Sequence, residues 1–229
     1  MKTIKTHFPN AILTVLFSVV WAVGSFAQDN AKSAKVHHAE PLYMDLVRDL
    51  GARKGEKEFN VGTEFKGLSS HNQYTFLVEY EFAPINRLGL EVEADFLFFK
   101  QKETHSELPG NKLECLRFSG QYSFFVSTKY RATLALGYTQ LIELTDFRDY
   151  RSGNLVSGTV HSPFFVAAKR WGKEIHTTIY TYPMIARDFT KTATEVDWAI
   201  NTSILYSLPQ SEHFVGVEIS QEFNHGEFG

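Results

Sequence analysis

Residues 73–99, QYTFLVEYEFAPINRLGLEVEADFLFF, decide the fold of this chain. On either side of Ala83–Asn86, apolar and polar residues alternate. This is the pattern of β-strands, because their side chains point to opposite faces in turn. A helical stripe cannot accommodate acidic residues at every second position. The segment therefore predicts two long strands joined by a tight turn, with one apolar and one polar face. The acidic positions of the polar face are Glu79, Glu81, Glu91, Glu93 and Asp95.

The same alternation recurs along the chain and predicts nine strands. Their apolar face carries Phe, Tyr, Leu, Val and Trp, whereas the opposite face is smaller and more polar. Bulky apolar side chains would overfill a small closed core, so we expect them to face lipid and the smaller face to line a narrow interior. The expected fold is all-β: an antiparallel, up-and-down transmembrane β-barrel of about 8–12 strands.

The lengths of the predicted connections give the barrel an orientation. Those after the second, fourth, sixth and eighth strands are short, and those after the third, fifth and seventh are long. Outer-membrane barrels have short periplasmic turns and long outer loops, so the N-terminus is expected in the periplasm. Single-chain bacterial barrels have an even number of strands, so either one of the nine predicted strands is part of a plug or the chain lacks at least one closing strand. Residues 224–227 read like the start of a loop, which favours a missing C-terminal strand.

The region before the strands divides into two predicted segments. Residues 1–27 have a basic start, a short apolar run, and Ser25 and Ala27 at a cleavage-like site, which is typical of a secretory signal peptide. Residues 28–57 are expected to form a periplasmic segment with a short helix that begins at Pro41 and ends before Gly51. Residues 58–229 are the expected barrel domain, and the cell outer membrane is the expected location.

Composition argues against several classes of function. Cleavage after Ala27 removes two lysines and takes the net charge from −3 to −5, so no basic patch for nucleic acid is expected. Cys115 is the only cysteine, which excludes an intramolecular disulfide. The sequence holds no catalytic or phosphate-binding motif, and the adjacent His37 and His38 lack the spacing of a metal site. We therefore expect a protein without enzymatic activity, cofactor or metal.

Charged residues on the polar face are the candidate functional residues. In a barrel they line the lumen, where an excess of carboxylates favours a small, positively charged solute and makes the protein a channel or transporter. One alternative is a structural or interaction barrel with a filled interior, in which Arg117 and Arg131 are paired with acids. Another is a soluble, lipocalin-like periplasmic binding protein with its apolar face turned inward. The lumen-lining candidates are Glu79, Glu81, Glu91, Glu93, Asp95, Arg117, Arg131, His176, Glu195, Asp197 and Glu218.

Four stretches of the chain resemble a known group of proteins. The sharpest likeness is HAEPLYMDLVRDLGARKGEKE at His38–Glu58, and a weaker likeness continues through Leu77–Pro84, Arg87–Glu93 and Phe165–Gly172. These stretches are similar to segments of outer-membrane β-barrel proteins of Gram-negative bacteria that are described as transporter-like. The resemblance implies the same fold and location, with outer-membrane lipid and a small solute as partners, and it identifies no substrate.

Overall fold

The computed structural model of the chain describes residues 33–41, 44, 46–102, 108–150, 155–189, 191, 193–211 and 213–228, with side chains up to residue 223. Residues 34–229 form one compact unit. The predicted signal peptide, residues 1–27, lies outside the described residues.

Nine antiparallel strands form a single sheet, in which each strand pairs with the next along the chain. This confirms the predicted all-β, up-and-down order of strands. The predicted hairpin of β2 and β3 is present, and its ladder places Glu79 opposite Glu93 and Glu81 opposite Glu91. The strands are β1 (Lys57–Gly67), β2 (His71–Ile85), β3 (Leu88–Gln101), β4 (Lys112–Ser127), β5 (Ala132–Leu144), β6 (Val156–Trp171), β7 (Ile175–Asp188), β8 (Ala193–Ser207) and β9 (Phe214–Phe228).

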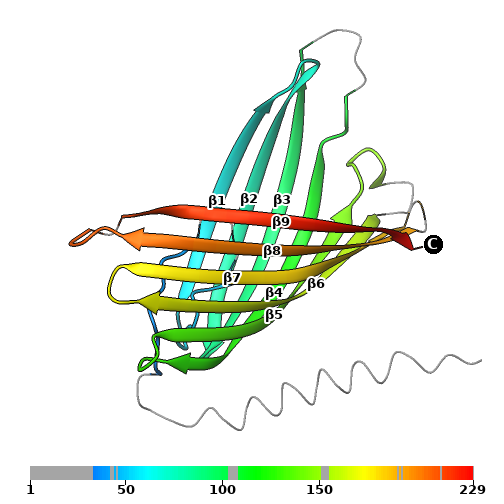
Figure 1. The fold of residues 1–229 in the computed structure, drawn as a ribbon. Helices are drawn as coiled ribbons and strands as arrows, with labels where there is room; N and C mark the ends of the chain where they lie inside the picture. The colour runs from blue at the N-terminus through cyan, green and yellow to red at the C-terminus, as the bar shows by residue number, and fades with distance from the viewer. Residues whose placement is uncertain are drawn as a thin grey trace, which may run out of the picture. The chain divides into compact units, whose positions relative to one another are not determined.

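The sheet is curled but open, which corrects the prediction of a closed barrel. Figure 1 shows β1, β2 and β3 running across the direction of β7, β8 and β9, as the right-handed twist of adjacent strands accumulates over the sheet. Within the described residues, β1 and β9 are the two edges and do not pair with each other. Because nine strands alternate in direction, β1 and β9 run the same way, so the hairpin order alone cannot join them as an antiparallel pair.

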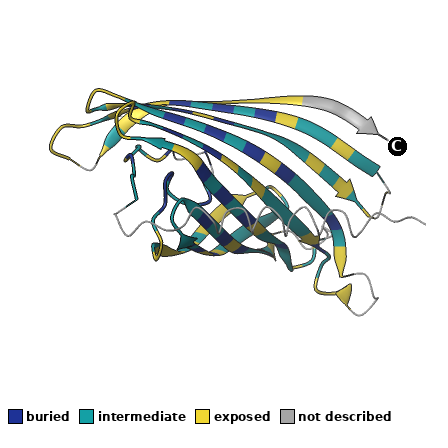
Figure 2. Ribbon diagram, turned by 90° about the horizontal axis from the view of Figure 1, so that it is seen from below, coloured by how far each residue is buried: buried dark blue, intermediate teal, exposed yellow. Residues whose placement is uncertain are grey.

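The polarity of the sheet follows the predicted alternation, with the polar face buried and the apolar face exposed. Bands of buried and exposed residues alternate along the strands in Figure 2. On the inner face, Glu91 and Glu93 are each only 2% exposed. On the outer face, Val61 is 64% exposed and Ile204 and Val217 are each 62% exposed. The apolar surface is therefore turned away from the interior of the molecule.

Residues 34–41, 44 and 46–56, which we call the plug segment, lie against the inner face of the sheet. Its residues Met44, Val47 and Leu50 join a buried cluster with apolar side chains of β5, β6 and β7. Its backbone is bound to the sheet as well, because the Gly51 amide donates to the Ser123 hydroxyl. The remaining members of the cluster are Ala135, Phe164, Val166, Ala168 and Tyr180.

The predicted helix from Pro41 to Gly51 is not seen in the described part of the plug segment. The physical reason is that its backbone bonds to the sheet instead of to itself. The side-chain amide of Gln121 donates a hydrogen bond to the Arg48 carbonyl at 2.7 Å. The backbone amide of Arg87 donates to the carbonyl of Ala52, just after the predicted helix, at 2.6 Å. Tertiary contacts thus replace the local hydrogen bonds of a short helix, which is marginal by itself. Among the described residues, no helix is long and apolar enough to cross a membrane.

Two of the predicted long connections are confirmed and one is not. The connections after β3 and β5, residues 102–111 and 145–155, are long and leave the sheet at the same end. The connection after β7, residues 189–192, is shorter than the one after β8, residues 208–213, which reverses the predicted order. The predicted alternation of short and long connections therefore holds for the connections after β2, β3, β4, β5 and β6, and fails after β7.

Candidate functional site

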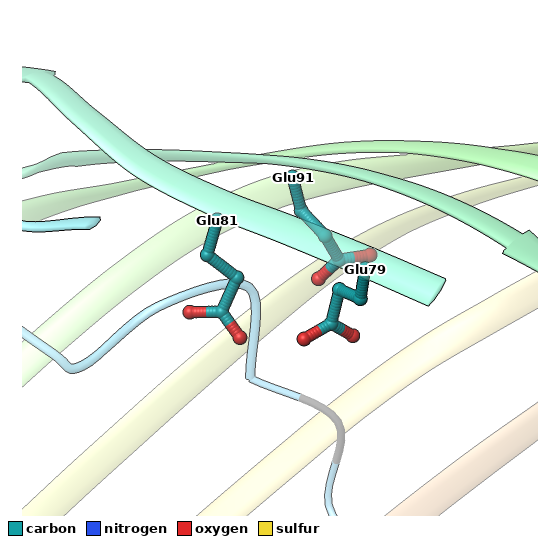
Figure 3. Close-up of side chains that lie close together, drawn as sticks. All are labelled: Glu79, Glu81 and Glu91. Atoms are coloured by element: carbon teal, nitrogen blue, oxygen red, sulfur yellow. The ribbon is translucent and has the colours of Figure 1, made fainter. Parts of the chain in front are cut away.

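Three carboxylates from β2 and β3 meet on the inner face of the sheet. Glu79 and Glu81 lie two positions apart on β2, and Glu91 lies on β3 opposite Glu81. Figure 3 shows the three carboxylate groups close together. One carboxylate oxygen of each residue lies within 4.8 Å of those of the other two. Like charges this close repel, so neighbouring groups must compensate them.

Polar partners on adjacent strands bind these acids. Asn60 of β1 donates to Glu79 at 2.8 Å, and Ser119 of β4 donates to Glu91 at 3.1 Å. The guanidinium Nε of Arg117 lies 3.3 Å from a carboxylate oxygen of Glu93. Arg117 therefore has the acidic partner that a filled interior requires, as the alternative interpretation of the sequence expected.

Arg48 of the plug segment carries a positive charge into the same region. Its Nη1 atom lies 2.9 Å from Glu81 and 2.5 Å from Glu58 of β1. Burial disfavours the charged guanidinium, but the bonds to these two carboxylates outweigh it and raise the pKa of Arg48 further. Gly89 makes the approach possible, since a Cβ atom there would lie 2.5 Å from the Cβ of Arg48.

An acid-lined cavity of about 440 Å³ lies between the plug segment and β1–β4. Seven carboxyl groups and two guanidinium groups border it, so acidic groups outnumber basic ones. Carboxylate oxygens spaced as in Glu79, Glu81 and Glu91 are also able to hold a hard divalent cation. The acidic residues that border the cavity are Glu40, Asp49, Glu58, Glu79, Glu81, Glu93 and Asp95.

Two of these acids share a proton at the plug segment. A hydrogen bond with Asp49, together with burial, raises the pKa of Glu40, so its carboxyl group holds the proton. Burial opposes the ionisation of Asp49, but Glu40 and Lys35 outweigh it and lower the pKa of Asp49. Lys35 lies 2.5 Å from Asp49 and 2.9 Å from Glu56, which ties the start of the plug segment to its end.

His176, predicted to line the lumen, instead binds the plug segment. Its Nδ1 atom accepts a hydrogen bond from the Ala39 amide at 3.0 Å, so the neutral ring carries its proton on Nε2. That nitrogen lies 3.1 Å from the Ser207 hydroxyl and donates to it. In this tautomer His176 cannot act as a base toward Ser207, so the pair lacks the arrangement of an activated nucleophile. The expected absence of enzymatic activity stays a prediction.

A family model described as HAEPLYID-like matches residues 34–229. The chain belongs to the HAEPLYID-like family. Residues 38–45 read HAEPLYMD, which differs from the family's name only at Met44. Searches of curated proteins and of solved structures found no match.

The remaining predicted site residues of this HAEPLYID-like chain lie apart from the acid-lined cavity. Arg131 is exposed in the turn before β5, where its guanidinium donates to the Gly172 carbonyl. Asp197 and Glu218 lie on β8 and β9, and neither borders the cavity. Glu195 is exposed near the start of β8. The predicted set thus divides into one real cluster on β2–β4 and several separate charges.

Arg48 belongs to the site but was not among the residues predicted from the sequence. The named octapeptide opens the plug segment, whose Arg48 supplies the positive charge between Glu58 and Glu81. The periodicity of the HAEPLYID-like segment places Arg48 on the polar side of a helix, and this gives no hint of its partners. These contacts join residues 10 and 33 positions apart, so no local spacing predicts them.

Proposed function

We propose that the curled sheet of this chain closes into a β-barrel in the outer membrane, of the channel or transporter type, which passes a small cationic solute. The observation that carries the proposal is the inverted polarity of the sheet. Carboxylates 2% exposed line its inside, whereas Val, Ile and Phe up to 64% exposed cover its outside. A sheet with this distribution is stable where hydrocarbon replaces water at its outer surface.

The outer surface supports a membrane location in a second way. Aromatic side chains occur toward both ends of the strands, where outer-membrane barrels carry girdles at the lipid–water boundary. A lipocalin-like cup would instead need its apolar face inside, and here that face is exposed. The aromatic residues in question are Tyr74, Phe82, Phe98, Tyr122, Trp171, Trp198 and Tyr206.

The charge of the cavity supports a cationic solute. Carboxylates concentrated in a site of low dielectric raise the local concentration of positive ions and repel anions. Arg48 occupies the same carboxylates that such a solute would contact, because it lies between Glu58 and Glu81. Passage therefore requires that the plug segment shifts or that the solute follows the acidic side of the lumen past it.

A structural barrel with a closed interior is the second candidate, and the buried cluster of the plug segment favours it. Met44, Val47 and Leu50 fill space beside β5–β7 with apolar side chains. The two candidates differ in a measurable property, because only the first conducts ions. The channel and the closed barrel are both expected in the membrane, whereas a soluble binding protein is not.

The first experiment is fractionation of cells that express the full chain, followed by gel electrophoresis with and without heating. We expect recovery in the outer membrane and a band whose mobility changes on heating, because a folded barrel resists detergent until it is boiled. Recovery in the soluble periplasmic fraction would reject the membrane proposal and favour the lipocalin-like alternative.

Planar bilayers then distinguish a channel from a closed barrel. Purified protein is expected to give cation-selective conductance, and the double variant Glu91→Gln, Glu93→Gln is expected to bring the cation-to-anion permeability ratio closer to one. Glu195→Gln, an exposed charge outside the cavity, is the matched control and should leave the ratio unchanged. Absence of conductance would favour the closed barrel, and unchanged selectivity in the double variant would remove the acidic lumen.

A further inference from the structure

A second cavity has the opposite charge. It measures about 350 Å³ and lies at the end of the sheet where the β4–β5 and β6–β7 turns meet the start of the plug segment. Its lining contains four basic side chains and no carboxylate. The lining residues are Lys35, Val36, His37, Thr128, Arg131, Arg170, Gly172 and Lys173, which we call the basic mouth.

The two arginines of the basic mouth are bound by backbone carbonyls of one turn. The guanidinium of Arg131 donates to Gly172, and the Nε of Arg170 donates to the Lys173 carbonyl at 2.9 Å. The Arg170 amide also donates to the Arg131 carbonyl at 2.8 Å, which joins the two turns. These contacts orient both guanidinium groups, and carbonyl partners leave their positive charge uncompensated.

No ion pair of Arg131, Arg170 or Lys173 occurs among the residues that the structure describes. Lys35 differs, because Asp49 and Glu56 both bind it. The basic mouth thus places three cations that have no ion pair in the described part of the chain, together with the hydroxyl of Thr128, around one cavity. A carboxylate oxygen of Glu174 lies in the same turn, 3.9 Å from where a Cβ atom of residue 172 would stand. Converging positive groups without acidic partners repel one another, and an anion between them removes that repulsion.

We propose that the basic mouth binds a phosphate-bearing anion. A guanidinium presents parallel N–H donors that match the oxygens of phosphate, and a lysine ammonium and a hydroxyl supply further donors. The site goes beyond the proposed passage of a cation, because its ligand has the opposite charge and it lies apart from the acid-lined cavity. The basic mouth and the acid-lined cavity have no lining residue in common. A smaller space beside His38 shares Lys35, Val36 and His37 with the basic mouth.

The phosphate can come from a lipid headgroup or from a free anion. Next to the basic mouth, Trp171 is 51% exposed and Tyr130 is 59% exposed. The Lys169 ammonium lies 4.7 Å from the Trp171 ring centre, and the Lys129 ammonium lies 5.5 Å from that of Tyr130. Exposed aromatic rings with basic neighbours are typical of the lipid headgroup region. A headgroup and inorganic phosphate offer the same oxygens to the site.

The test uses the full chain, folded in phosphate-free detergent micelles and titrated with inorganic phosphate by calorimetry. We expect saturable binding that Lys173→Gln weakens about tenfold, which is the loss of one charge-assisted hydrogen bond. Lys100→Gln removes an equal charge from the exposed end of β3 and should leave the affinity unchanged. Lys173 is chosen because none of the described hydrogen bonds involves its side chain, so the turn stays intact.

Lipid nanodiscs identify the source of the phosphate. With phosphatidylglycerol present, a headgroup ligand is expected to block the binding of added phosphate and to remain bound to the wild type, but not to Lys173→Gln, in native mass spectrometry. A free anion would instead still bind in the nanodisc. Either result supports the site. Absence of saturable phosphate binding together with equal lipid retention by both variants would overturn it, whatever the conductance measurements give.

Discussion

At the scale of single residues, Arg48 connects the plug segment to the inner face of the sheet. Its side chain is 11% exposed and lies between Glu58 and Glu81, while its carbonyl accepts from Gln121. An arginine in this position compensates two acids and binds the plug segment to β1, β2 and β4. A buried charge is costly unless it keeps a partner of opposite charge. The stability of the cluster of Arg48, Glu58 and Glu81 therefore depends on each of these residues.

Arg48→Gln is expected to destabilise the folded protein by about 3 kcal/mol, because it leaves the largely buried carboxylate of Glu81 without its cation. The urea midpoint of the protein in detergent micelles measures the effect. In the double variant Arg48→Gln, Glu81→Gln, part of the loss should be recovered, since the uncompensated charge is removed as well. Additive losses in the double variant would contradict the pairing of Arg48 with Glu81.

His38 makes the binding of the plug segment depend on pH. Burial, together with the nearby His176, Arg170 and His37, lowers the pKa of His38 from 6.5 to about 4. Between these values the unfolded chain binds a proton that the folded protein resists, so stability falls as the pH decreases from about 6.5 to about 4. The neutral ring lies 3.0 Å from the Thr133 hydroxyl, and protonation is expected to weaken this attachment of the plug segment.

Urea midpoints of the wild type and His38→Gln between pH 7.5 and pH 4.5 measure this dependence. The glutamine keeps a polar group near Thr133 and cannot take up a proton, so its stability should fall less steeply below pH 6.5. The difference between the two curves isolates His38 from the carboxyl groups, which titrate in both proteins. Parallel curves would show that His38 does not titrate at a lowered pKa.

At the scale of elements, the plug segment and the sheet form one interlocked structure. A Cβ atom added to Gly89 of β3 would lie 2.5 Å from the Cβ of Arg48, so only glycine permits this close approach. Where the plug segment returns to the sheet, the Gly55 amide donates to the Ala83 carbonyl and the Ala83 amide to the Glu56 carbonyl, both at 2.8 Å. Displacement at Gly89 therefore loosens the middle of the plug segment while its end remains attached to β2.

Gly89→Val is expected to displace the plug segment and to raise the conductance of the protein in planar bilayers. The added side chain would overlap Arg48, while the exposed outer face of β3 would be unchanged. Gly62→Val is the matched control, because a Cβ at Gly62 would meet only ordinary contacts, the nearest at 3.5 Å from Leu77. An equal conductance for both variants would indicate that the plug segment does not obstruct the route.

At the scale of the whole molecule, the outer surface decides the solvent in which the sheet is stable. Val78 at the middle of β2 is 37% exposed and lies between Phe76 and Tyr80 on the same face. In water such a residue contributes little, and its replacement by a charged residue is harmless. In hydrocarbon the same replacement is costly, by about 2–4 kcal/mol for arginine near the bilayer centre.

Val78→Arg therefore distinguishes a membrane protein from a soluble one. We expect a loss of stability of about 2–4 kcal/mol in lipid vesicles, measured from the urea dependence of folding. Gln210→Arg places the same charge in the exposed β8–β9 turn and is expected to cost less than about 1 kcal/mol. Equal effects of the two variants would contradict a lipid-facing outer surface.

Much of the architecture could be predicted because it depends on local alternation. The period of two in β2 and β3 predicted the hairpin and the face of each acid, and both are confirmed, whereas the register of the two strands came from the structure. The short helix at Pro41–Gly51 was wrong, because a stripe of leucines suits a helix and also a strap packed on a sheet. The acidic candidates on β2 and β3 were grouped correctly, whereas Arg131, Asp197 and Glu218 were not part of the group.

The sequence by itself determined which side chains share a face, since strand geometry makes every second residue equivalent. It also determined the family, through residues 34–229. Only the tertiary structure decided where the plug segment lies, that Arg48 joins Glu58 and Glu81, and that the sheet is open between β1 and β9. These features depend on contacts between residues distant in the chain and on accumulated strand twist, and neither leaves a periodic signal in the sequence.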